Sequence, residues 1–147
     1  MIRLRLDMAK EFVMTRRVHF SETDRAGVLY FAHYYRFMEE TEHAFRRSLG
    51  RPIITKVDGC ETTWPRVATS CEYFAPAHFD DELELALRIT GLGNRSVTYE
   101  VEFRCEGRRI ALGRMTAVYC TSANGEFQSA TIPESLRQTL EGAMKSS

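Results

Sequence analysis

The chain has 147 residues, with 20 Lys plus Arg and 20 Asp plus Glu, so its formal net charge is zero. There is no excess of basic residues to attract nucleic acid or an anionic membrane. A net charge near zero also favours self-association, which is consistent with an oligomer. The length suits a single domain, which we expect over residues 1–147 with its core at about 11–122.

The N-terminus and the cysteines favour a cytoplasmic location. Residues 1–10 alternate apolar and charged side chains without the apolar run of a signal peptide, and no stretch approaches the length of a membrane span. The four cysteines form no C-x-x-C pair and have no histidine at metal-ligand spacing. We therefore expect reduced thiols and no metal site.

The first predicted strand covers residues 11–20, where the apolar side chains share one parity and Arg16 is the exception. A polar segment, residues 21–25, ends this strand. It is followed by Gly27 and by a long helical pattern.

The helix is predicted over residues 27–49, because its apolar residues recur at spacings of three and four. Residues 28–38 are apolar on nearly every side, which indicates a segment buried all round. The later half is expected to carry a solvated flank with an ion pair between Glu42 and Arg46. Asp24 then lies just before the helix, where unpaired amides and the positive dipole end favour negative charge.

The rest of the chain is mostly strand. Residues 53–63 are expected to form a loop over the helix end. Alternating apolar residues or turn signals predict strands over 65–74, 82–89, 97–104 and 109–121, a short hairpin with Phe127 after Asn124-Gly125, and a helix over 133–144. Four strands joined by short turns run antiparallel, and their apolar face needs the long helix as cover. We predict an α+β fold in which an antiparallel sheet wraps around one central helix, whose apolar first half needs a second subunit.

Two stretches resemble a known family. The first is the run from Phe20 to Tyr34, F-S-E-T-D-R-A-G-V-L-Y-F-A-H-Y, and the second is the segment from Pro65 to Tyr73 with the Asp80-Asp81 turn that follows it. Both resemble the hotdog-fold acyl-CoA thioesterases of the 4-hydroxybenzoyl-CoA thioesterase type, including the YbgC-like group. The resemblance covers residues 14–121 and implies the hotdog fold, as a homodimer or homotetramer with active sites between subunits.

The resemblance also implies a chemistry. Asp24 becomes the catalytic carboxylate, as nucleophile or general base, and the backbone N–H groups of Tyr30 and Phe31 polarise the thioester carbonyl. Amide donors at a helix start suit the negative charge that develops on that oxygen. Coenzyme A enters as part of the substrate, and no other cofactor is expected.

The chain departs from the family pattern at two positions. His33 stands where the family often has Asn, and Phe31 stands where YbgC-like members commonly have His. The Tyr-Phe-Ala run looks closer to members acting on aromatic acyl-CoAs, such as 1,4-dihydroxy-2-naphthoyl-CoA. Tyr34 and Trp64, with Tyr30 and Tyr35, are candidate aromatic walls for such a substrate.

Other candidate site residues have two interpretations each. His33 either bonds to backbone in the core or orients water or Asp24. Arg95, between Asn94 and Ser96 in a hairpin that lies near the coenzyme A nucleotide in relatives, either pairs with a phosphate or is exposed. Arg66 is a further phosphate or pantetheine contact. Trp64 either packs in the core, forms a wall of the substrate pocket, or does both.

Two other functions compete with acyl-CoA hydrolysis. Hydrolysis of acyl groups from a carrier protein would need a basic docking surface, and the arginines are too scattered in sequence to decide this. A non-catalytic acyl-CoA sensor would use the same pocket, but a carboxylate beside an apolar acyl chain is costly without a chemical role. A hotdog dehydratase fits less well, because the helix lacks that branch's arrangement of His and Glu.

Overall fold

A computed structural model describes residues 10–57 and 59–144 of the chain. Its elements, in chain order, are β1 (Phe12–Arg17), the 3-10 turn η1 (Phe20–Glu22), α1 (His33–Ser48), β2 (Thr55–Val57), β3 (Cys60–Thr63), β4 (Arg66–Tyr73), β5 (Glu82–Leu92), β6 (Ser96–Cys105), β7 (Arg108–Val118), β8 (Cys120–Ala123), β9 (Glu126–Ser129) and α2 (Glu134–Met144).

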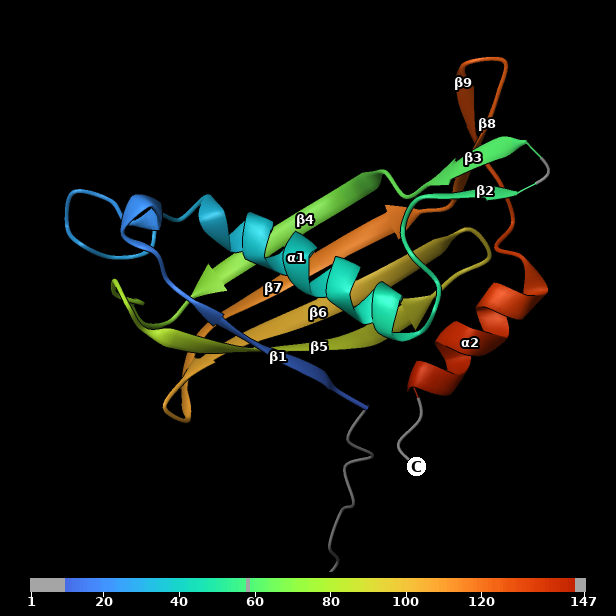
Figure 1. Cartoon of the computed structure of the whole chain (residues 1–147). Coiled ribbons are helices and arrows are strands. Elements are labelled where there is room, and N and C mark those ends of the chain that lie inside the picture. The colour runs from blue at the N-terminus through green and yellow to red at the C-terminus, as the bar shows by residue number, and fades with distance from the viewer. Residues whose placement is uncertain (1–9, 58, 145–147) are drawn as a thin grey trace, which may run out of the picture.

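A five-stranded antiparallel sheet, in the order β1-β5-β6-β7-β4, curves around α1 (Figure 1). The prediction of an antiparallel sheet wrapped around one long helix is confirmed. The alternation in β5 and β6 directs Leu83, Leu85 and Val101 towards the helix, where Phe37 and Met38 pack in the same buried core. Neither helix among the described residues is long and apolar enough to cross a membrane.

The strand order differs from a simple run of hairpins. β4 pairs with β7 at one edge of the sheet, whereas β5 pairs with β1 and β6. The segment after β4 therefore crosses one end of the sheet before β5 begins. It is this end that carries the loop between β1 and α1 (Figure 1).

Three predicted boundaries are wrong. β1 ends at Arg17, and Phe20, expected inside the first strand, lies in η1 with 76% of its surface exposed. Within residues 53–63, expected as a loop, strands β2 and β3 pair antiparallel. The strand predicted over 109–121 breaks after Val118, and β8 joins a second sheet in the order β2-β3-β8-β9.

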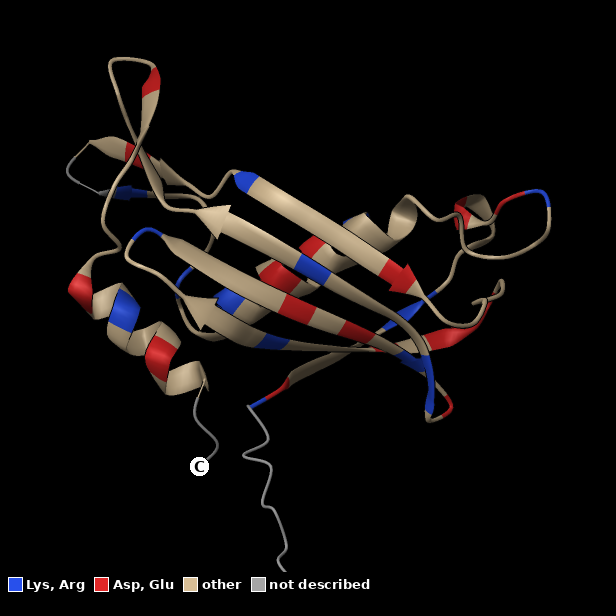
Figure 2. Ribbon diagram, turned by 180° about the vertical axis from the view of Figure 1, so that it is seen from behind, with Lys and Arg blue, Asp and Glu red and all other residues tan. Residues whose placement is uncertain are grey.

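The charged residues on α1 are also placed differently from the prediction. Glu42 and Arg46, expected in a solvated pair, are 0% and 2% exposed. Glu42 forms its ion pair with Arg66 of β4. On the outer face of the sheet, Figure 2 shows acidic and basic residues on neighbouring strands. Glu100 of β6 forms ion pairs with Arg88 of β5 and Arg114 of β7.

Gly113 of β7 lies directly against Met38 of α1. A Cβ atom there would overlap the thioether of Met38. We predict that Gly113→Ala lowers the free energy of unfolding by about 1–3 kcal/mol, because overpacking forces buried side chains from their rotamers. In that background Met38→Ala should cost less than it does in the wild type, as measured by urea unfolding of all four proteins.

Gly142 of α2 provides the matched control, because a Cβ there meets nothing within 4 Å. Gly142→Ala should leave stability unchanged or raise it by up to about 1 kcal/mol. Additive losses at Gly113 and Met38 would contradict the proposed contact.

Candidate active site

The loop between η1 and α1 brings most of the predicted catalytic residues together. The helix begins at His33, so the prediction that residues 27–32 are helical is wrong. These residues instead form tertiary backbone contacts: Val28 bridges to His78, and the Leu29 N–H donates to the Ala77 carbonyl at 2.7 Å. Gly27, at φ +79°, lets the chain reverse direction before them.

Asp24 is fixed by the backbone of this reversal. Its Oδ1 accepts hydrogen bonds from the Ala26 N–H at 2.8 Å and the Val28 N–H at 3.4 Å. Its own N–H donates to the Val28 carbonyl at 2.8 Å. Within residues 10–57 and 59–144, Oδ2 has no hydrogen-bond partner, and the side chain is exposed in the single chain. One carboxylate oxygen is thus held while the other is available.

The two amides predicted to polarise the carbonyl differ in their surroundings. The Tyr30 N–H donates to the Glu22 carbonyl at 2.9 Å, so in this structure it is already used. The Phe31 N–H has no acceptor in the described part of the chain. It lies two residues before the first residue of α1, where the helix presents its positive end. Of these two amides, only that of Phe31 is available to a ligand within the described part of the chain.

A cavity of about 400 Å³ opens beside Asp24 and Phe31. Its lining is largely apolar and consists of Asp24, Val28, Leu29, Tyr30, Phe31, Tyr34, Tyr73, Phe74, Ala75 and Pro76. The Tyr73 hydroxyl donates to the Phe31 carbonyl at 3.0 Å, and its ring meets that of Tyr34 at 4.9 Å. Burial raises the pKa of Tyr34 to about 12, so the phenol stays neutral at ordinary pH.

An ion-pair cluster joins the loop between β1 and α1 to the two elements that flank it. The Arg16 guanidinium donates to both carboxylate oxygens of Glu22, at 2.9 and 2.6 Å, and to Glu40 of α1 at 2.9 Å. It also lies 4.3 Å from the centre of the Phe37 ring. These contacts join β1, η1 and α1, and we call Arg16, Glu22 and Glu40 the arginine clamp.

Sequence reasoning did not assign the clamp a role. Its one signal was Arg16, which has the parity of the half-buried side chains in β1. Burial by itself would raise the pKa of the Glu22 carboxyl. The Arg16 guanidinium and the backbone N–H of His19, which donates to Glu22 at 2.8 Å, outweigh this effect of burial. The pKa of Glu22 is consequently held below its usual value.

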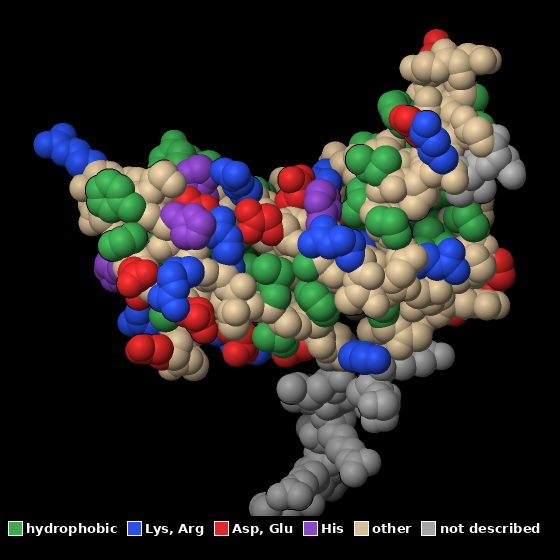
Figure 3. Space-filling view, viewed as in Figure 1, with side chains coloured by type: hydrophobic (Ala, Val, Ile, Leu, Met, Phe, Trp, Pro, Cys, Tyr) green, Lys and Arg blue, Asp and Glu red, His purple; other side chains and the backbone are tan. Residues whose placement is uncertain are grey.

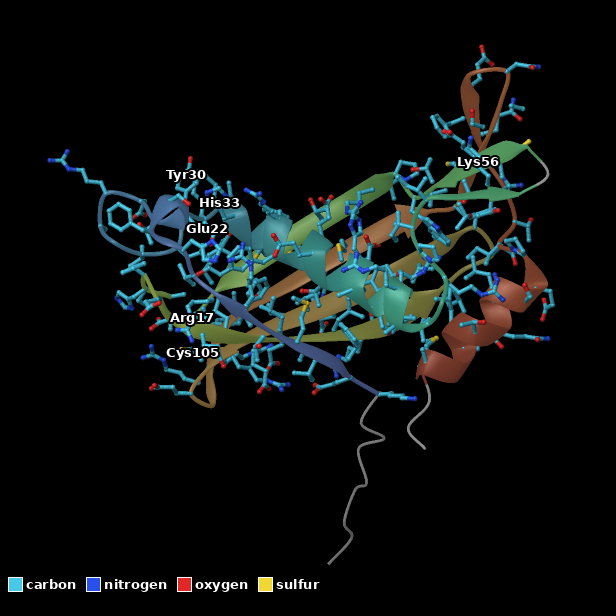
Figure 4. All side chains as sticks on the ribbon, in the orientation of Figure 1. Arg17, Glu22, Tyr30, His33, Lys56 and Cys105 are labelled. Atoms are coloured by element: carbon cyan, nitrogen blue, oxygen red, sulfur yellow. The ribbon has the colours of Figure 1, made fainter. Side chains whose placement is uncertain are left out.

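His33 contacts Tyr30 but does not line the cavity beside Asp24. The centre of the His33 ring is 5.7 Å from that of Tyr30, and the His33 backbone N–H donates to the Tyr30 carbonyl at 2.9 Å. Figure 4 shows Glu22, Tyr30 and His33 at the same end of the molecule, with Lys56 of β2 at the other.

The remaining predicted site residues do not join Asp24 within one chain. Trp64 is buried near the C-terminal end of α1. Arg66 pairs with Glu42 and, at 3.8 Å, with Glu39 beside the middle of α1. The exposed loop at 93–95 packs against β9 and the segment before α2. Arg95 donates to Ser129 at 3.1 Å, and the Asn94 carbonyl accepts the Ile132 N–H at 2.9 Å. Ser96 begins β6 beside it.

The candidate site holds no cluster of metal ligands among the described residues. Across residues 10–57 and 59–144, no three His, Cys, Asp or Glu side chains are grouped so that they could hold a metal ion. The four cysteines are free thiols, and Cys120 alone among them is buried.

Comparison with known proteins gives one family. Residues 26–112 match the model of the thioesterase superfamily. A protein of Aquifex aeolicus, provisionally named an esterase, is 31% identical over 88% of this chain and 98% of its own length. A 1,4-dihydroxy-2-naphthoyl-CoA hydrolase of Synechococcus elongatus is 25% identical over 89% of this chain and 96% of its own.

The solved structures agree with this result. A gentisyl-coenzyme A thioesterase superimposes with a TM-score of 0.73 at 29% identity, over 88% of this chain and 99% of the other. A 1,4-dihydroxy-2-naphthoyl-CoA thioesterase of Synechocystis, at 23% identity, shares the fold with a TM-score of 0.75 over 88% of this chain and 95% of the other. The predicted resemblance to hotdog-fold thioesterases is confirmed.

The arginine clamp predicts a pH-dependent contribution to stability. Because the pKa of Glu22 is lower in the folded chain than its usual value of 4.5, the unfolded chain binds the proton more tightly. The stabilisation is complete above pH 4.5 and is lost as the pH falls through the lower, folded value. We predict that Glu22→Gln lowers the free energy of unfolding by about 1–3 kcal/mol at neutral pH and by less in acid, as measured by urea unfolding.

Glu82→Gln is the matched control, because its ion pair with Arg17 joins side chains that are 50% and 57% exposed. Its effect should stay below about 1 kcal/mol at every pH. A constant effect of Glu22→Gln from neutral to acid pH would contradict a role for its charge.

Proposed function

The chain belongs to the thioesterase superfamily, and we propose that it hydrolyses an acyl-CoA thioester to a free acid and coenzyme A. The observation that supports this most directly is the placement of Asp24. One oxygen of this carboxylate is held by backbone amides, the other has no partner among the described residues, and the cavity beside it also receives Phe31.

The Phe31 amide is the proposed oxyanion donor. The thioester oxygen becomes negative when the carbonyl carbon is attacked, and a fixed N–H beside the positive end of α1 stabilises that charge. The Tyr73 hydroxyl, through its bond to the Phe31 carbonyl, limits rotation of the same segment. Tyr30 contributes by anchoring the loop to Glu22, since its own N–H is occupied.

Asp24 can serve by either of two routes. Its free oxygen attacks the carbonyl carbon, the thiolate of coenzyme A leaves, and water then hydrolyses the mixed anhydride. Alternatively, the carboxylate takes a proton from a water molecule, which attacks in its place. Both routes need only the carboxylate, a water molecule and the amide, with coenzyme A supplied by the substrate.

The walls of the cavity favour an aromatic or medium-length acyl group. Tyr34, Tyr73 and Phe31 present aromatic surfaces next to Asp24, and offset or edge-on aromatic pairs add to simple burial. Two relatives are named for aromatic substrates, a 1,4-dihydroxy-2-naphthoyl-CoA hydrolase and a gentisyl-coenzyme A thioesterase. Aromatic acyl-CoAs are therefore the first substrates to test.

We also propose that two copies pair along β4. This edge strand, the residue after it, the loop before α1 and the first turn of α1 expose large apolar side chains, namely Tyr30, Phe31, Tyr35, Val67, Tyr73 and Phe74. Figure 3 shows the outline of the molecule dipping between the η1 end and the β8–β9 end, the two ends that β4 connects in Figure 1. A strand edge and apolar side chains exposed together are a usual place for pairing.

A two-fold pairing has a consequence for the site. Antiparallel β4 strands centred near their middle place Arg66 of the partner subunit opposite Tyr73. Arg66, which lies far from Asp24 in one chain, then approaches the cavity of the other chain. This would reconcile its predicted role as a substrate contact with its separation from Asp24 in the single chain.

The catalytic proposal predicts the effect of Asp24→Asn. The substitution keeps an oxygen for the Ala26 and Val28 amides but removes the nucleophile and the base. We expect release of coenzyme A from an aromatic acyl-CoA, read as free thiol, to fall at least about a hundredfold while substrate still binds.

Asp80→Asn is the control, because Asp80 is an exposed aspartate outside the cavity and Asn tolerates its φ of 70°. It should leave turnover unchanged. Binding of acyl-CoAs by the wild type without any turnover would instead support the sensor function.

The dimer proposal predicts the effect of Val67→Lys. A lysine on the outer edge of β4 should disfavour pairing, shift the protein towards monomer in sedimentation equilibrium, and reduce turnover. Val13→Lys, at an exposed position on the opposite edge strand β1, should change neither property. A wild type that sediments as a monomer at all concentrations would contradict the pairing.

A further inference from the structure

A second cavity, of about 330 Å³, lies at the end of α1 opposite to Asp24. The last turn of α1, the β2–β3 hairpin and the first turn of α2 surround it. Since α1 has 16 residues, the two ends of the helix are about 24 Å apart. Asp24 and the rest of the candidate active site contribute nothing to its lining within one chain.

Arg46 is a buried cation in the wall of this cavity. Only 2% of its surface is exposed, and its guanidinium lies 4.9 Å from the centre of the Trp64 ring. Its Nε donates to the Arg51 carbonyl at 2.8 Å, but its buried Nη1 has no hydrogen-bond partner in the described part of the chain. A buried, incompletely paired guanidinium is unfavourable unless a further acceptor reaches it.

The nearest carboxylate on α1 does not neutralise Arg46. Glu42, one turn earlier, forms its ion pair with Arg66, and no ion pair joins Arg46 to any acid within residues 10–57 and 59–144. Burial raises the pKa of the Glu42 carboxyl, against the opposing effect of Arg66 and Arg46. The positive charge at the cavity therefore remains uncompensated by direct contact.

Other groups at the cavity also favour an anion. Arg51 supplies a second guanidinium, whose Nη2 donates to the Ser135 hydroxyl at 3.2 Å. Ser135 and Leu136 belong to the first turn of α2, an 11-residue helix whose opening amides have no acceptor within the helix. The lining contains no aspartate or glutamate.

The remaining walls are apolar and aromatic. The rings of Trp64 and Tyr119 are 5.2 Å apart, and Leu136 with two prolines completes the surface. A ligand that matches both the two guanidinium groups and the aromatic wall has a flat apolar body and one negative group. We propose that this cavity is a binding site for a small aromatic carboxylate, with its carboxylate at Arg46 and Arg51 and its ring against Trp64 and Tyr119.

Trp64 allows a direct measurement, because it is the sole tryptophan of the chain. Titration of the full-length protein with benzoate should change the tryptophan fluorescence in a saturable way. Benzamide, which has the same shape without the charge, should bind at least about tenfold more weakly, and inorganic phosphate should also bind more weakly.

Variants separate this site from its surroundings. Arg51→Gln should weaken benzoate binding by about tenfold or more, whereas Arg47→Gln, at an exposed position in the same helical turn as Arg46, should not. Arg46→Lys keeps the charge but loses the planar pair of donors, and should also weaken binding. Unchanged urea unfolding would show that each variant is folded.

Several outcomes would overturn the proposal. These are the absence of a saturable response to benzoate, equal affinity for benzamide or phosphate, and equal weakening by Arg47→Gln. Asp24→Asn should abolish turnover but leave the benzoate response intact. A benzoate response that Arg51→Gln leaves unchanged would assign it to the thioester site, whereas a response that Arg51→Gln weakens in a protein without thioesterase activity would support this site alone.

Discussion

The arginine clamp is the interaction on which the candidate active site depends. The loop from His19 to Ala32 has little core of its own, since Leu29 and Glu22 are its only buried residues. Ordering a backbone residue costs about 1–2 kcal/mol, so a loop of this length needs contacts beyond the burial of one leucine. Arg16 supplies them by joining the start of the loop to the strand before it and, through Glu40, to the helix after it. The Asp24 carboxylate is oriented by backbone atoms that this clamp helps to hold.

The sequence identified the parts of the fold that depend on local pattern. The alternation in β5 and β6, and the spacing of Phe37, Met38 and Phe45 on α1, predicted the sheet, the helix and their contact. The start of α1 was missed because residues 28–32 continue the apolar pattern of the helix. In the folded chain, residues 28 and 29 bond to the segment at 77–78, and no local pattern reports a partner so distant in sequence.

The buried charges of α1 were missed for a related reason. Glu42 and Arg46 have the spacing of an exposed helical ion pair, and that spacing says nothing about what covers the helix. Here the β2–β3 hairpin and α2 close over this end, and neither placement is encoded in the pattern of α1 itself (Figure 1). Asp24, Tyr30, Phe31 and Tyr34 of the motif line one cavity. The motif could not show that Trp64 lies at the other end of the helix, because motifs give residue types without positions in space.

The exposure of Asp24 in the single chain bears directly on the proposed chemistry. A fixed amide stabilises an oxyanion most strongly where water is excluded, because water weakens electrostatic interactions. In one chain the cavity is open, and Tyr30, Phe31 and Tyr73 around it are exposed apolar groups that favour burial. Pairing along β4 would bury these side chains and enclose the carboxylate in the same step. Under that proposal the energy that drives association also removes water from the reacting thioester, so an isolated subunit would lack both the partner and the medium that its carboxylate needs.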